Sequence, residues 1–109
     1  MKETMEIKQV VTDIQKIAEP LISKLEKTDN KSTAEYIRKL IVEIETNGWM
    51  SCHSLYLILQ GSQFDYIEEQ ADEAANALKE LYELMAYVSI RGLAELEIKL
   101  AAMKKNDID

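Results

Sequence analysis

Turn-forming residues are scarce in this sequence. It contains three glycines and one proline among 109 residues. A turn-rich β sandwich needs a turn signal about every 8 to 12 residues, so this composition excludes such a fold. Hydrophobic residues make up 47% of the chain, which is enough for one globular core. The composition therefore predicts a single all-α domain that spans residues 1–109.

Cysteine and long apolar runs are also nearly absent. Cys52 is the only cysteine, so the chain forms no internal disulfide, as is typical of proteins in the reducing cytosol. No stretch approaches the ~20 apolar residues of a membrane span. Residues 1–6 interleave charges where a signal peptide has an apolar core. We therefore expect a cytoplasmic protein that does not contact a membrane.

Basic residues are missing from a long central segment. No lysine or arginine occurs between Lys39 and Lys79, whereas seven acidic residues do. The rest of the chain has 13 acids and 13 bases, so this segment holds the whole net charge of −7. Phosphate contacts need clustered bases, so we expect no direct nucleic-acid binding. The charge fits a partner with a basic surface, although solubility alone also explains it.

Apolar residues at three- and four-residue spacing predict the first two helices. One covers residues 5–27, where Pro20 should cause a kink or a break. The other covers residues 33–47. The segment 32–35 is a capping-box pattern that marks its start, and Gly48 follows its end.

A short third helix is predicted over residues 52–60. Residues 55–59 are all apolar, so the helix should be either deeply buried or part of an interface. A strand is the alternative for so short an apolar run, but no partner strand is visible elsewhere. Trp49 lies just before this helix and is placed to fold back onto the last turn of the second.

The longest periodic segment covers residues 63–105. Its apolar positions advance as a heptad seam over Phe64, Ile67, Ala71, Ala74, Leu78, Leu81, Met85 and Val88. The phase slips near Gly92, where we expect a bend. An unbroken helix of this length would extend about 65 Å, whereas a compact domain of this size has a radius of gyration near 13 Å. The sequence therefore predicts a bundle of three or four helices with a long C-terminal helix, and a homodimer that pairs through the 64–88 seam.

Five acidic residues are predicted to share one face at the start of that long helix. On a helical wheel they fall within about 140°, and they are Asp65, Glu68, Glu69, Asp72 and Glu73. Acids near a helix N-terminus favour its dipole, which explains them without any further role. The alternative is an electrostatic contact surface, because like charges on one face repel until a basic partner binds. A divalent cation site is a third possibility, which one helix face alone would form poorly.

Motifs for catalysis and metal binding are weak. Cys52 and His53 are the only residues of their types, and a zinc site needs three or four protein ligands. Neighbours on a helix also point about 100° apart, so His53 is badly placed to act as a base for Cys52. We expect a buried or partly buried cysteine and a surface histidine. No catalytic residue, metal ligand or cofactor is predicted.

The hypothesis that the sequence favours is a small, acidic, non-enzymatic regulatory or inhibitory protein that binds another protein. Trp49, Met50 and Tyr56 are types found at interface hot spots and would anchor the partner, while the five acids would steer its basic surface. Core packing is the other possible role of the three anchors. By class analogy, the protein would resemble phage- or plasmid-borne inhibitors that block a basic nucleic-acid-binding groove. The alternatives are a small metal-dependent helical hydrolase and a structural subunit of a larger assembly.

Overall fold

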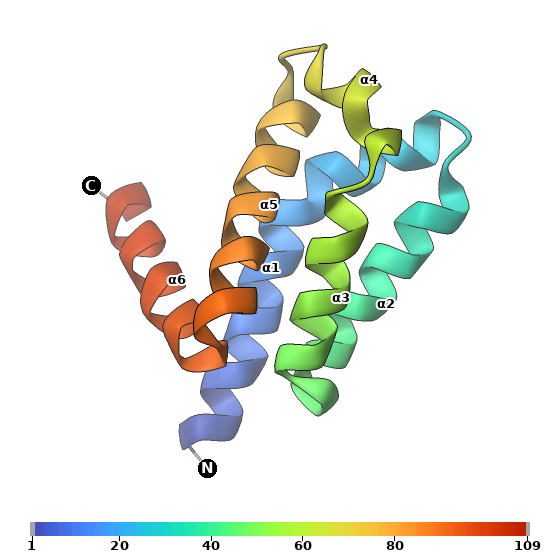
Figure 1. The fold of residues 1–109 in the computed structure, drawn as a ribbon. Helices are drawn as coiled ribbons and strands as arrows, with labels where there is room; N and C mark the ends of the chain where they lie inside the picture. The colour runs from blue at the N-terminus through green and yellow to red at the C-terminus, as the bar shows by residue number, and fades with distance from the viewer. Residues whose placement is uncertain (1, 109) are drawn as a thin grey trace.

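The chain folds into α-helices joined by short connections, with no strand among the described residues (Figure 1). The computed structural model describes residues 2–108, with side chains described for residues 7–103. The elements are α1 (Lys2–Lys27), α2 (Lys31–Asn47), α3 (Trp49–Leu59), the 3₁₀ helix η1 (Ser62–Phe64), α4 (Asp65–Glu68), α5 (Glu73–Arg91) and α6 (Leu93–Ile108). The predicted all-α fold is confirmed, but the described residues form six α-helices rather than three or four.

One apolar core holds these helices together. α1 packs against α2 and α5, and α3 packs against α2 and α5 on another side of the core. The largest side chains that are fully buried include Ile14, Leu21, Ile37, Ile41, Leu55, Phe64, Ile67, Leu78 and Leu81. Burying each such side chain stabilises the fold by about 1.5–3 kcal/mol. The radius of gyration is 13.4 Å, which is the size of one compact domain of this length.

α1 continues through Pro20 as one helix. Proline removes one backbone donor from a helix interior, so a kink or a break was the expectation. Figure 1 shows α1 changing direction in its C-terminal half, where Pro20 lies. Leu21, Ile22 and Leu25 are buried after the proline, and their packing holds the last turns in the helix.

α2 begins at Lys31, and the predicted capping box does not form. Asn30 takes the N-cap position, and no side chain caps the helix. The Asn30 amide instead donates to the hydroxyl oxygen of Tyr66 at 2.9 Å and to the Thr28 carbonyl at 3.0 Å. The helix therefore starts just after the residue whose side chain bonds to Tyr66, and not just after Ser32 as the local sequence pattern predicts.

The predicted helix 63–105 is wrong as a single element. It is divided into η1, α4, α5 and α6, with breaks at residues 69–72 and at Gly92. Ala71 has φ +50°, which is the left-handed region that ends a helix. Asp72 then caps α5, because its Oδ1 accepts a hydrogen bond from the Ala75 N–H at 3.1 Å. The segment with the heptad pattern is therefore two helices, because Asp72 is the N-cap of a new one.

The heptad seam is the core of a single chain rather than a surface for a second copy. Every member except Ala71 is buried, and α5 packs against α1 and α3. The interface predicted for a homodimer is thus covered by the chain's own helices. Gly92 has φ +94°, and α6 folds back after it to contact α1 and α5. Leu96 and Leu100 are buried there, at 0% and 3% exposure.

Polar contacts also attach α6 to α5. The Tyr87 hydroxyl donates to Glu95 Oε2 at 2.7 Å, and Lys99 Nζ lies 5.2 Å from the centre of the Tyr87 ring. The hydrogen bond to Glu95 raises the pKa of Tyr87 above its ordinary value.

Within the described part of the chain, no helix has both the length and the apolar character that a membrane span requires.

Candidate functional site

One side of α3 exposes large uncharged side chains, which we call the α3 outer face. It consists of Trp49, Met50, His53, Tyr56 and Leu57, which fall within about 120° of the helix. The buried residues Ser51, Cys52, Leu55 and Leu59 lie on the opposite side. Met50 is 67% exposed, Leu57 is 53% exposed and Trp49 is 46% exposed.

The composition of α3 explains why this face remains apolar. The helix has no Asp, Glu, Lys or Arg over its 11 residues. Gly48 separates it from α2 with φ +54°, a conformation that L side chains rarely adopt. The helix can therefore turn back along α2 while burying only one side. Its other side has no charged residue to make it hydrophilic.

Four aromatic rings follow one another from α3 to α5, and we call them the aromatic row. Trp49 stacks on His53 with ring centres 5.3 Å apart and an interplanar angle of 12°. His53 lies 6.2 Å from Tyr56, and Tyr56 stacks on Tyr82 of α5 at 5.6 Å. Such ring pairs stabilise by about 0.5–1.5 kcal/mol beyond the area they bury. The row therefore links α3 to the exposed side of α5.

Hydrogen bonds hold the polar edges of the row. The Trp49 Nε1–H donates to the Ser89 carbonyl at 3.3 Å, and His53 Nδ1 lies 2.6 Å from Ser89 Oγ. The prediction that Trp49 folds onto α2 is therefore wrong, since it bonds to α5. His53 lies on the outer side of α3, as predicted, with its ring half-buried beside Trp49. These hydrogen bonds and ring contacts hold the aromatic row in one arrangement.

Two groups in this region stay in their neutral forms at neutral pH. The hydrogen bond with Tyr82 raises the pKa of Tyr56, with burial as a second cause, and Gln60 Nε2 donates to the Tyr56 hydroxyl at 3.1 Å. Burial raises the pKa of the Cys52 thiol to about 12. Cys52 is therefore buried, as predicted, and a thiol in this state is a poor nucleophile.

The five predicted acids do not share one helix face. Asp65 and Glu68 belong to α4, Glu69 is the residue that follows it, and Asp72 and Glu73 begin α5. The helical-wheel prediction assumed one continuous helix. The turn at residues 69–72 instead separates the acids of α4 from those at the start of α5. Glu73 and Asp72 lie beside α1, where they line a groove together with Lys24.

Asp72 has a structural role. Besides capping α5, its Oδ2 lies 3.1 Å from Lys24 Nζ, and Lys24 also donates to the side chain of Gln70. The Ala75 N–H and then the Lys24 ammonium lower the pKa of Asp72 below its ordinary value of 3.8. The helix-start explanation is therefore the right one for this residue. Lys24 comes from α1, outside the segment that lacks bases in sequence.

Replacing Asp72 with asparagine should lower the melting temperature by a few degrees at pH 7 and by progressively less in acid. Asparagine is also a good N-cap, so the change removes the charge and keeps the cap. Because the folded-state pKa is lowered, the carboxylate stabilises the fold above pH 3.8, and this contribution is lost as the pH falls through the folded-state value. The Asp72 side chain is 41% exposed, so solvent screening keeps the effect small.

Melting curves of both proteins between pH 7 and pH 2 measure this difference. Asp65→Asn is the control, since Asp65 is an exposed acid of the same segment. It should leave the melting temperature at pH 7 nearly unchanged. A difference between the Asp72→Asn variant and the unaltered protein that stays the same at pH 2 would contradict the proposed charge effect.

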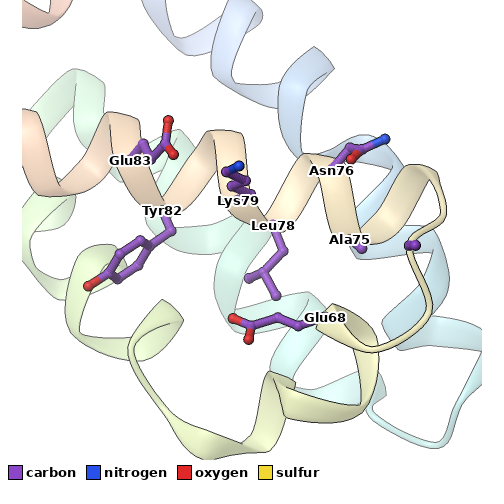
Figure 2. A pocket seen from close by; sticks show the side chains of 8 residues that line it. Glu68, Ala75, Asn76, Leu78, Lys79, Tyr82 and Glu83 are labelled. Carbon is purple, nitrogen blue, oxygen red and sulfur yellow. The ribbon is translucent and has the colours of Figure 1, made fainter.

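Glu68 lines a pocket on the exposed side of α5, which we call the α4/α5 pocket (Figure 2). Its volume is about 520 Å³. Its lining residues are Glu68, Ala71, Ala75, Asn76, Leu78, Lys79, Tyr82 and Glu83. Tyr82 is also the last ring of the aromatic row, so the pocket adjoins Tyr56 of the α3 outer face.

The predicted contact site is therefore split. Trp49 and Met50 lie at the start of α3, whereas α4 follows the end of α3 (Figure 1). A helix of 11 residues is about 16 Å long, so α3 separates the two groups by this length. Tyr56 lies between the two ends and contacts Tyr82. The apolar part of the prediction is exposed on one face, and of the five acids only Glu68 lines the neighbouring pocket.

Sequence reasoning missed His53, Tyr82 and Glu83 as members of this region. The spacing of His53 from Trp49 and Tyr56, at four and three residues, was a readable signal for one helix face. The approach of Tyr82 to Tyr56 depends on how α3 packs on α5. No local pattern in the sequence encodes that contact.

The described side chains contain no group of three or more His, Cys, Asp or Glu residues placed to hold a metal ion. Comparison of the chain with protein-family models, curated proteins and solved structures finds no match. The function is therefore argued from the geometry and charge of the site.

Proposed function

We propose that this chain is a non-enzymatic, cytoplasmic regulatory protein that binds another protein through the α3 outer face. The observation that carries the proposal is the exposure of Trp49, Met50 and Leu57, at 46–67%, on a helix without charged residues. Exposed apolar patches of this kind mark interaction sites. Tryptophan, tyrosine and methionine are also enriched at protein interfaces.

The partner that fits best has a basic surface around an apolar contact. The chain has a net charge of −7, so its field attracts a positively charged protein and speeds the encounter. A second copy carries the same negative charge, which disfavours self-association through this face. An inhibitor that covers a basic nucleic-acid-binding groove has this combination of charge and apolar contact.

A structural subunit of a larger assembly is the second candidate. The observation in its favour is that apolar side chains are also exposed away from α3, where Ile90 near the end of α5 is 80% exposed and Ile98 on α6 is 63% exposed. Exposed apolar side chains on more than one side of a small domain suit a subunit with two neighbours. The metal-dependent hydrolase is less favoured, because in the part of the chain whose side chains are described no group of three or more His, Cys, Asp or Glu residues is placed to hold a metal ion.

Leu57→Glu should reduce partner capture at least tenfold. The change places a carboxylate within the contact, where burial without a cation costs more than the ~1.4 kcal/mol that corresponds to tenfold. The measurement is quantitative affinity capture from a lysate of the source organism, followed by mass spectrometry of the bound proteins.

Val42→Glu is the matched control. Val42 lies on α2 and is 53% exposed, the same fraction as Leu57, so both variants add one charge at an equally exposed apolar position. A partner captured by the unaltered protein and by the Val42 variant, but lost with the Leu57 variant, supports the proposal. Equal loss with both variants would contradict a contact at α3. Circular dichroism should give both variants the native helix content.

A further inference from the structure

We propose that the α4/α5 pocket receives an arginine side chain of the partner. This inference rests on the proposed function for its biological setting, and it assigns a ligand chemistry to a region next to the α3 outer face. The pocket is large enough, since its volume of about 520 Å³ lies within the usual range of ligand pockets, about 300–1,000 Å³.

The pocket presents carboxylates from two different elements. Figure 2 shows Glu68 reaching from α4 toward Leu78 of α5, while the carboxylate of Glu83, next to Tyr82 on α5, points away from Glu68. Among the side chains that the structure describes, neither Glu68 nor Glu83 forms an ion pair or a hydrogen bond. Glu68 can therefore accept hydrogen bonds from a cation seated beside Leu78, and Glu83 adds a second negative charge at the Tyr82 end of the pocket.

The remaining lining fits the other parts of an arginine side chain. Ala71, Ala75 and Leu78 provide an apolar floor for the three methylenes of its stem. The ring of Tyr82 offers a face on which a planar guanidinium can stack. The same ring packs on Tyr56, so a partner seated on α3 has the pocket within reach.

The charge of the lining selects the sign of the ligand. Lys79 also lines the pocket, which leaves two carboxylates against one ammonium. This balance disfavours an anion. An ammonium is more strongly hydrated than a guanidinium and cannot stack in the same way, so arginine is preferred over lysine. Lys79 should oppose the bound cation. Removing its charge should therefore tighten binding, whereas removing the charges of the two glutamates should weaken it.

The experiment is an NMR titration of the ¹⁵N-labelled protein with a tri-arginine peptide, followed by a tri-lysine peptide of the same length. We expect the largest shift changes at Glu68, Leu78 and Tyr82, and weaker binding of tri-lysine. Glu68→Gln with Glu83→Gln should weaken tri-arginine binding about tenfold, which is the effect of losing charge-assisted hydrogen bonds. Lys79→Gln should tighten binding at least twofold.

The control is Glu35→Gln with Glu45→Gln, two exposed acids of α2. It changes the net charge by the same amount and should alter tri-arginine binding less than twofold. Equal weakening by the two double variants would overturn the proposal, because the peptide would then sense only net charge. Weaker binding after Lys79→Gln would also overturn it, since Lys79 would then support the bound peptide rather than oppose a bound cation.

The same titration separates this inference from the proposed function. Leu57→Glu should leave tri-arginine binding unchanged, because Leu57 does not line the pocket. Arginine binding in the pocket without any effect of Leu57→Glu on partner capture would refute the α3 contact and retain the pocket. Loss of capture with Leu57→Glu, but no peptide shifts at the pocket, would refute the pocket and retain the contact.

Discussion

Phe64→Ala should lower the free energy of unfolding by about 3–5 kcal/mol. Phe64 is the only phenylalanine, is 1% exposed, and ends the 3₁₀ helix that leads into α4. Truncation leaves a cavity and detaches the segment that positions Glu68. Small domains have only about 5–15 kcal/mol of stability, so the loss would be a large part of the total.

Urea denaturation followed by circular dichroism measures the effect. Tyr36→Ala is the control, since Tyr36 is an aromatic residue that is 48% exposed on α2. Its truncation should cost less than about 1 kcal/mol, as for most surface changes. Similar losses from the two substitutions would show that Phe64 is not part of the core. Fluorescence of Trp49, the only tryptophan, provides a second probe of the same transition.

Leu96→Ala should cost about 2–5 kcal/mol. Leu96 is fully buried because α6 turns back at Gly92 and packs on α1 and α5. If α6 instead projected as the end of one long helix, the same substitution would have almost no effect. This variant therefore tests the correction of the long C-terminal helix directly.

The control for Leu96 lies two residues away on the same helix. Ile98 is 63% exposed, so Ile98→Ala removes apolar atoms that are mostly in water already. Its cost should stay below about 1 kcal/mol. Equal and small costs at both positions in urea denaturation would contradict the docked arrangement of α6.

Helix type and most helix faces were predictable because apolar spacing determines which side is buried. The segments 5–27 and 33–47 match α1 and α2 to within a few residues at each end. The seam residues Leu78, Leu81 and Met85 are buried as a periodic stripe should be. Periodicity reports the buried side, but it does not say whether another copy or the same chain covers that side.

The break at residues 69–72 was hidden because two helices in compatible phase look like one. Asp72 was counted as a member of an acidic face, whereas an aspartate before Glu73 and Ala74 is also a normal N-cap. Once Asp72 starts a helix, the common face with Asp65 disappears. One capping choice therefore changed both the fold prediction and the predicted site.

The candidate site was partly predictable for a related reason. Trp49, Met50 and Tyr56 lie on one side of α3, which begins three residues earlier than the predicted helix 52–60. The pairing of Tyr56 with Tyr82 and the ion pair of Asp72 with Lys24 join residues that are distant in sequence. Such contacts follow from how the helices cross, which is decided by the whole core.

The position of Cys52 has a practical consequence for measuring how the molecule opens. It is the only thiol, it is buried on the inner side of α3, and it stays protonated in the folded protein. A thiol reagent will therefore modify the chain only in conformations where α3 has separated from α2 and α5. The labelling rate therefore reports how often α3 detaches from the rest of the domain. Slower labelling in the presence of a ligand would show that the ligand holds this helix in place.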